Sequence, residues 1–250
     1  MQIAIFTVFK PTTKHKIMKI LTTLLLLFFT LTALKAEEYD KYKFGARFNP
    51  NMSWLAPDLG TPDERSVSNR GVNFGFSFGL EGNYYFASNY AINTELRITR
   101  YIKGDMRSRN PEEDRSEDYS FRFHYVELPV GIRLQTNQFG YFDYFIRFNL
   151  VPGFSTSRQG DLFDKNEGEV KEGISLNDDV RFFRGAGEVA MGTRYQLAGS
   201  IFLKGSISYN HGFFNIIQGN PENEALDDLR DENGLDVRNH YLGLNLGVLF

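Results

Sequence analysis

The chain has 250 residues, with 28 Lys and Arg against 31 Asp and Glu, and it contains no Cys. The absence of Cys excludes a disulfide framework and a thiolate metal site. Aromatic residues make up 15% of the sequence, with 24 Phe and 13 Tyr, and there are 23 Gly. This composition favours strands, because aromatic side chains suit a pleated surface and glycine permits bends.

The first 36 residues differ in composition from the rest of the chain. They contain five Lys, no Asp or Glu, and an apolar run from Ile20 to Leu34. A basic flank, an apolar stretch of about 15 residues and a small final residue are typical of a secretory signal peptide. We therefore expect residues 1–36 to be an N-terminal extension with a signal peptide that is cleaved after Ala36. The body of the protein would then be residues 37–250.

Two alternatives remain open at this end of the chain. The apolar run would be a transmembrane anchor if it were longer, since such anchors usually need roughly 20 apolar residues. Met18, which is followed by Lys, would also be a more usual start than Met1. Without the five Lys of the extension, the remaining 23 bases and 31 acids give a net charge of −8.

After residue 36 the hydrophobic pattern has a period of two residues, which is the period of a strand. The clearest example is the stretch 71–86, where large apolar side chains share one face and polar or small residues share the other. Further strands are predicted at 43–54, 90–101, 119–134, 140–154, 180–196, 200–210 and 240–250. The total is eight strands and no helix.

The predicted strand 119–134 changes phase in its middle. Phe121, Phe123 and Tyr125 alternate in one phase, and from Val126 onward the large apolar residues alternate in the other. One extra residue in a strand produces such a shift and is typical of a β-bulge. We therefore expect a bulge here that keeps both apolar rows on the same face.

The connections between the predicted strands alternate strictly between long and short. The short ones are residues 87–89, 135–139 and 197–199, and the long ones are 55–70, 104–118, 155–179 and 211–236. This alternation predicts an up-and-down sheet with all long loops on one side. An even number of strands lets the last strand pair with the first, which removes both sheet edges. The predicted fold is all-β, an eight-stranded antiparallel up-and-down β-barrel.

The apolar rows indicate that the barrel is a transmembrane β-barrel. An eight-stranded interior is just wide enough to be filled by side chains, so it cannot hold nearly all of the Phe and Tyr rings. With the rows facing outward into lipid, seven bases and five acids face the interior and can pair there. These predicted luminal charges are Arg47, Glu81, Glu95, Arg97, Glu127, Arg133, Asp143, Arg147, Arg184, Glu188, Arg194 and Lys204.

Three segments resemble a known family. Residues Phe48–Trp54, His124–Arg133 and Ile207–Ile216 are similar to segments of the PorT-like outer-membrane β-barrel proteins of Bacteroidota. The resemblance spans most of the mature chain and implies an outer membrane protein beta-barrel domain. Since founding members of that family take part in type IX secretion, it also implies an accessory role in secretion or transport.

The C-terminal stretch is a further candidate site. Every second residue from Leu242 is apolar, and the set is Leu242, Leu244, Leu246, Val248 and Phe250. An alternating strand of this kind can add to the edge of a partner sheet. We expect it to close the barrel and to be the signal that the barrel-assembly machinery binds during biogenesis.

The sequence gives little support for catalysis or for a bound cofactor. The four His are scattered, at positions 15, 124, 211 and 240, and no metal, cofactor or catalytic residue is predicted. The four long loops contain 23 acids and 9 bases, a net charge of −14. A negative surface of this size excludes nucleic acid as a partner.

The predicted function is therefore a non-enzymatic structural or interaction role in the outer membrane, with outer-membrane lipid and an unidentified envelope protein as partners. The termini would be periplasmic and the long loops extracellular. Two alternatives stay open, namely a narrow pore for small solutes and a barrel enzyme that acts on lipid or peptide at the loop rim.

Overall fold

The structure is a computed structural model that describes residues 41–58, 66–110, 115–164, 170–218 and 235–250. The predicted signal peptide lies outside the described residues. Among the described residues no helix is long and apolar enough to cross a membrane. The strands are β1 (Tyr42–Asp58), β2 (Ser66–Asn69), β3 (Asn73–Ala87), β4 (Tyr90–Asn110), β5 (Arg115–Glu127), β6 (Val130–Gln135), β7 (Phe142–Asp164), β8 (Val170–Ser175), β9 (Phe183–Ala198), β10 (Ile201–Gly212) and β11 (Asp236–Leu249).

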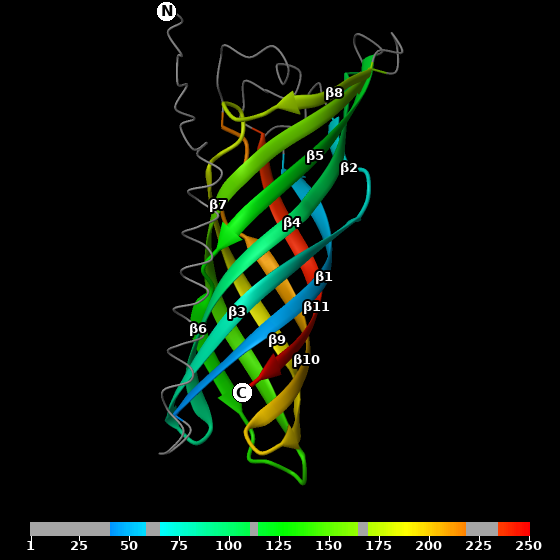
Figure 1. Ribbon diagram of the computed structural model, residues 1–250. Helices are drawn as coiled ribbons and strands as arrows, with labels where there is room; N and C mark the ends of the chain where they lie inside the picture. Colours follow the sequence, from blue (N-terminus) through cyan, green and yellow to red (C-terminus); the bar gives the residue numbers. More distant parts are fainter. Residues whose placement is uncertain (1–40, 59–65, 111–114, 165–169, 219–234) are drawn as a thin grey trace, which may run out of the picture. The chain divides into compact units, whose positions relative to one another are not determined.

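The strands form a closed antiparallel barrel (Figure 1). The order around the ring is β4, β3, β1, β11, β10, β9, β7 and β5, and β5 pairs with β4 to complete it. β6 continues β5 after Leu128 and Pro129 and pairs with the same two neighbours. In the described part of the chain the ring therefore has eight strands, and the predicted fold class is confirmed.

The barrel closes through its first and last strands, as predicted. β1 pairs with β11 from Gly45 opposite Leu249 to Asp58 opposite Asp236. Beyond this ladder, the backbone amides of Phe44 and Phe250 each donate a hydrogen bond to the other residue's carbonyl, at 3.0 and 2.8 Å. The row that ends at Phe250 is thus held in the sheet.

Large apolar side chains cover the outside of most of the barrel. The rows predicted to face lipid do face outward, with exposed fractions between 46% and 61% for Phe78, Ile92, Ile132, Phe148, Ile207 and Leu244. Residues between them in the sequence face the interior and are buried, as the alternating pattern of β3 illustrates. A surface of this kind is stable in lipid.

Two of the predicted long loops are largely strand, which corrects the sequence analysis. β4 and β5 remain paired to Asn110 opposite Arg115, so 104–118 is mainly a hairpin. β7 continues to Asp164 with β8 along its edge. In Figure 1 these extensions project from one end of the barrel, and the short turns lie at the other end. Exposed charged residues in these strands, such as Arg109 and Lys171, give them a composition that resembles that of a loop.

The phase change in 119–134 is not a bulge in that strand, which is a second correction. From Tyr119 to Glu127 burial in β5 alternates without interruption, and Phe123, Tyr125 and Glu127 all face the interior. The bulges lie in the two neighbouring strands, where the pairing register shifts between Thr99 and Ile102 of β4 and around Thr156 of β7. The inner face of β5 itself changes from apolar to charged at this level.

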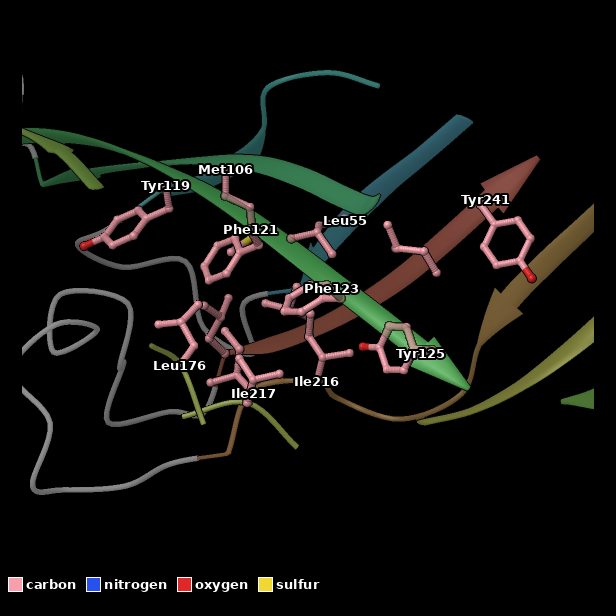
Figure 2. Packing of buried hydrophobic residues seen from close by; sticks show 14 residues of the cluster. Leu55, Met106, Tyr119, Phe121, Phe123, Tyr125, Leu176, Ile216, Ile217 and Tyr241 are labelled. Atoms are coloured by element: carbon pink, nitrogen blue, oxygen red, sulfur yellow. The ribbon is translucent and has the colours of Figure 1, made fainter. Parts of the chain in front are cut away.

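The inward residues of the projecting end form an apolar cluster (Figure 2). Phe121 and Phe123 of β5 pack with Leu55 of β1, Leu176 and Ile216, and each of the five is at most 6% exposed. The prediction that these β5 rings face lipid is therefore wrong. The strands extend beyond the lipid-facing rows here, so an apolar interior and a polar exterior are the stable arrangement, as in a water-soluble protein. We call the whole set the upper apolar cluster, and its members are Leu55, Ile102, Met106, Tyr119, Phe121, Phe123, Tyr125, Leu176, Val180, Ile216, Ile217, Leu235, Val237 and Tyr241.

Candidate functional site

The twelve predicted luminal charges are all buried, with exposed fractions of 0–3%. They come from every strand of the ring except β11. Each occupies an inward position of its strand, as its burial shows. This arrangement concentrates seven basic and five acidic side chains inside the barrel, between the short turns and the upper apolar cluster.

Arg97 of β4 lies at the centre of these charges. Its Nη1 is 2.7 Å from Glu188 Oε2 on β9 and 3.5 Å from Glu127 Oε2 on β5, and its Nε is 3.0 Å from Glu95 Oε1 on β4. Nη1 also donates a hydrogen bond of 2.7 Å to the hydroxyl of Tyr241. One guanidinium thus connects β4, β5, β9 and β11 across the interior.

Further ion pairs extend from this centre toward both ends. Arg47 Nε lies 2.8 Å from Glu95 Oε1, and Arg184 Nη1 lies 2.8 Å from Glu127 Oε1. Arg147 is 3.4 Å from Glu81 and 3.6 Å from Glu188, and Lys204 pairs with Glu81. The result is one continuous set, which we call the central ion network: Arg47, Glu81, Glu95, Arg97, Glu127, Arg147, Arg184, Glu188 and Lys204.

Arg194 and Asp143 form a separate pair closer to the short turns. Arg194 Nε lies 2.8 Å from Asp143 Oδ1, and its two terminal nitrogens donate 2.8 Å hydrogen bonds to the Tyr85 hydroxyl and to Gln135 Oε1. All three nitrogens of this guanidinium therefore have partners. Such a fully hydrogen-bonded arrangement offsets the cost of burying the charge.

Arg133 is the exception among the twelve. It is 0% exposed, yet none of its three side-chain nitrogens has a hydrogen-bond partner among the described residues. Its guanidinium carbon lies 4.0 Å from the centroid of the Phe145 ring, a cation–π contact. In the β6–β7 ladder it lies directly opposite Arg147, so a like charge is its cross-strand neighbour.

Neutral polar groups complete the central ion network, and the sequence analysis did not identify them. Asn245 Oδ1 accepts hydrogen bonds from Arg47 Nη1 at 2.5 Å and from Asn49 Nδ2 at 2.6 Å. Gly79 provides space, because a Cβ at this position would lie 2.1 Å from Glu95 Oε1. Asn49, Asn245 and Gly79 share the inward phase of the predicted charges, and this phase would have identified them.

Lys43 is an eighth buried base that the sequence analysis missed. It is 8% exposed, and its Nζ lies 4.6 Å from the centroid of the Phe202 ring. It precedes Arg47 by four positions in the same strand, so period-two alternation already placed it on the inward face. With it, the inward bases outnumber the five predicted acids by three.

The histidines are less scattered than the sequence analysis expected. His211 and His240 are opposite each other in the β10–β11 ladder, and their ring centroids are 4.6 Å apart. The Tyr209 hydroxyl lies 3.4 Å from Nδ1 of each ring. His240 also lies beside Trp54, with centroids 5.8 Å apart. All four side chains alternate with buried inward residues, so this aromatic group belongs to the outer surface.

The geometry indicates what the charged interior can do. Each carboxylate of the central ion network contacts at least two bases or a base and a hydroxyl, as Glu127 does with Arg97, Arg184 and Thr99. Removing one partner from such a set leaves an uncompensated buried charge. Among the described residues no group of three or more His, Cys, Asp or Glu is arranged to hold a metal ion. The interior is therefore a set of cross-strand ion pairs that fixes strand register.

The C-terminal row lies on the lipid-facing surface of β11. Leu242, Leu244, Leu246, Val248 and Phe250 are 38–49% exposed. The residues between them point inward, and Asn245 among them joins the central ion network through Arg47. The same strand thus presents its apolar row to lipid and its polar row to the network.

Neisserial surface protein A has a solved structure that aligns with 85% of this chain and 99% of its own, at 12% identity and a TM-score of 0.42. The outer membrane protein OprG from Pseudomonas aeruginosa aligns with 83% of this chain and 95% of its own, at 11% identity and a TM-score of 0.46. Comparison with the curated proteins gave no match.

The family assignment rests on the sequence. The model of the outer membrane protein beta-barrel domain matches residues 37–218, which is well over half of the chain. The matched range begins directly after the predicted signal peptide and covers the strands from β1 to β10. This chain therefore belongs to the outer membrane protein beta-barrel domain family and is an integral β-barrel protein of the outer membrane.

Proposed function

We propose that this protein is a structural or interaction component of the outer membrane that neither conducts solutes nor catalyses a reaction. The filled interior is the observation that carries this proposal. Arg97, Arg133 and Arg147 are each 0% exposed at the level of the charged residues, and the upper apolar cluster occupies the interior above them. A barrel packed in this way serves as a rigid support for its extracellular strands.

Planar-bilayer recording tests this proposal against the narrow-pore alternative. We expect no steady single-channel steps from the purified, folded protein. Glu95→Gln and Arg147→Gln are informative variants, since both residues lie in the central ion network. Steady steps in the wild-type protein whose size changes in these two variants would identify a pore and refute the proposal.

The enzyme alternative is tested at the outward aromatic group. Tyr209, His211 and His240 are the described residues that bring a hydroxyl within 3.4 Å of two imidazoles. Incubation of the purified barrel with outer-membrane lipids, followed by mass spectrometry, is expected to give no new product. A product that forms with the wild type and not with Tyr209→Phe would support the enzyme alternative.

We further propose that the protein is PorT-like and acts as an accessory to secretion or transport through an envelope protein partner. The similarity of the segment His124–Arg133 to PorT-like proteins supports this assignment. Chemical cross-linking in intact outer membranes, followed by purification of the barrel, tests it. One partner recovered in stable proportion would place the protein in a complex, and recovery of the barrel alone would count against the partner role.

The proposed topology has periplasmic termini and extracellular long loops. The strands β4, β5 and β7 extend on the loop side, and the short turn at Ser88 lies at the other end. Since the chain has no Cys, single cysteines report position without background. On intact cells a membrane-impermeant maleimide should label Asp178→Cys and leave Ser88→Cys unlabelled. The opposite labelling would reverse the topology.

We also propose that the C-terminal row is the signal bound by the barrel-assembly machinery, after export by the signal peptide of residues 1–36. Its alternating, outward apolar side chains can dock on a partner sheet edge before β1 does. Deletion of Phe250 should lower the amount of folded protein in the outer membrane. Equal amounts of folded protein from the truncated and full-length chains would argue against a signal that includes Phe250.

A further inference from the structure

The bulge in β4 places two consecutive side chains on the outside of the barrel. The β4–β5 register shifts between Thr99 and Ile102, and Arg100 and Tyr101 lie in the gap. Both are exposed, whereas their neighbours Thr99 and Ile102 are buried. Tyr101 has a φ of 57°, the one positive value among the non-glycine residues described. Backbone strain of this kind is maintained by the surrounding structure and is frequent at binding sites.

The two bases at this bulge contact aromatic rings of the described residues and no acid among them. Arg100 Nη1 lies 3.0 Å from Nδ1 of His124, a neutral partner, and Lys103 Nζ lies 5.6 Å from the centroid of the Tyr101 ring. No carboxylate of the described residues pairs with either base. We call Arg100, Tyr101, Lys103 and His124 the bulge patch.

The neighbouring bases on the same outer surface differ in this respect. Arg107 Nε lies 2.7 Å from Asp118 Oδ1, and Arg122 Nη2 lies 2.6 Å from Asp161 Oδ2. Acids are thus abundant on this surface and neutralise the bases farther from the lipid-facing rows. Arg100 and Lys103 differ from these neighbouring bases, because no carboxylate of the described residues pairs with them.

The bulge patch lies at the upper boundary of the lipid-facing rows. On β4 the outward residue directly below it is Ile98, which is 39% exposed, and above it the outward position is Asp105. The Tyr101 ring lies 5.8 Å from the ring of Phe76, the residue opposite Arg100 on β3. A ring that is apolar on one side and polar on the other is typical of a membrane–water interface.

We propose that the bulge patch binds the phosphorylated headgroup of a lipid in the membrane leaflet on the side of the long loops. The Arg100 guanidinium would donate paired hydrogen bonds to phosphate oxygens, with Lys103 as a second positive charge and His124 as a further hydrogen-bonding group. The acyl chains would lie along the outward row that begins at Ile98. This site needs no protein partner and is independent of the proposed accessory role.

Native mass spectrometry of the detergent-solubilised barrel tests the proposal, with diphosphorylated lipid A as the lipid and its phosphate-free form for comparison. The double variant Arg100→Gln/Lys103→Gln should bind the phosphorylated lipid about tenfold more weakly than the wild type. Arg238→Gln is the matched control, since this outward base is on β11 and already pairs with Asp236. It should bind as the wild type does. Heat-modifiable gel migration confirms that each variant is folded.

Three results would overturn the proposal. The first is unchanged binding by the double variant, and the second is equal binding of the phosphorylated and phosphate-free lipids. The third is complete displacement of the lipid by inorganic phosphate, which would show a simple anion site without the acyl contacts. Tighter binding of the phosphorylated lipid that depends on Arg100 and Lys103 and survives inorganic phosphate would support it.

Discussion

The two halves of this barrel follow opposite rules for what is buried. At the level of the lipid-facing rows, ion pairs such as Arg97 with Glu188 are inside and apolar side chains are outside. In the projecting end, rings such as Phe121 are inside, and ion pairs such as Arg122 with Asp161 are outside. β5 and β6 run through both halves, with burial that alternates from Tyr119 onward. The medium around the barrel, and not the strand, decides which residue type is buried.

Tyr241 of β11 lies where the two halves meet. Its ring belongs to the upper apolar cluster, and its hydroxyl accepts a hydrogen bond from Arg97 at the centre of the ion network. The bulges of β4 and β7 occur near the same level, next to Thr99 and Ser155. The interior therefore changes from charged to apolar at the level where β4 and β7 have their bulges.

Breaking the central ion network should have the largest effect. Glu188→Gln removes a carboxylate that serves Arg97 and Arg147, and loss of one partner from a buried set costs about 3–5 kcal/mol of unfolding free energy. Urea unfolding in lipid vesicles, followed through the fluorescence of Trp54, measures it. Arg133→Met is the control, because Arg133 has no carboxylate partner among the described residues, and its loss should be nearly neutral. Equal destabilisation by both variants would show that pairing does not matter.

Removing a ring from the upper apolar cluster should cost almost as much. Phe123 is 0% exposed, and Phe123→Ala leaves a cavity whose expected cost is about 3 kcal/mol. Phe148→Ala is the comparison, since Phe148 faces lipid and is 47% exposed. Lipid chains refill that space, so the same unfolding assay should give a smaller loss. A larger loss at Phe148 would contradict the assignment of Phe123 to a packed core.

An arginine on the outer surface should distinguish the two surrounding media. Leu244→Arg places a charge on the lipid-facing row of β11, with an expected cost of about 2–4 kcal/mol. Phe163→Arg makes the same change on the projecting part of β7, where the side chain is 41% exposed, and should cost less than about 0.5 kcal/mol. The ratio of folded to unfolded protein after refolding into vesicles measures both. Similar costs would mean that lipid covers both positions.

Removing an ion pair from the outside of the projecting end should have the smallest effect. Arg122 and Asp161 are about one-third exposed, with side-chain exposures of 34% and 28%, so Arg122→Gln should cost about 0.5 kcal/mol. The loss should shrink further at high salt, because exposed pairs are screened. Unfolding at low and high salt measures both quantities. A loss as large as that of Glu188→Gln would remove the distinction between buried and exposed pairs.

Alternation in the sequence was sufficient to predict the lipid-facing half. It identified the outward rows, such as Phe142 and Tyr144 of β7, the eight-stranded ring and the pairing of β1 with β11. It also selected inward charges that the structure places together. The outward rows and the inward charges depend on period two, which is visible wherever the two faces of a strand differ in polarity. The ring and its closure also required the even number of strands and the alternation of long and short connections.

Other features depend on partners that are distant in sequence. Arg97 and Glu188 are 91 positions apart, and alternation does not specify which acid an inward base contacts. The sequence did not reveal that the inner face of β5 changes from apolar to charged residues, and the reason is different. This change resembles a shift of phase, and only the burial of Phe123 and Glu127 on the same face shows that the strand is regular. The meeting of His211 with His240 likewise required the register of β10 and β11.

The seam between Phe44 and Phe250 has a consequence for biogenesis. The two residues that exchange backbone hydrogen bonds there are 206 positions apart. Phe44 and Phe250 cannot pair in a fragment that lacks β11, so β1 keeps an unpaired edge until β11 is present. Closing this seam is therefore a late step in folding, because the two strands that pair are far apart in the sequence.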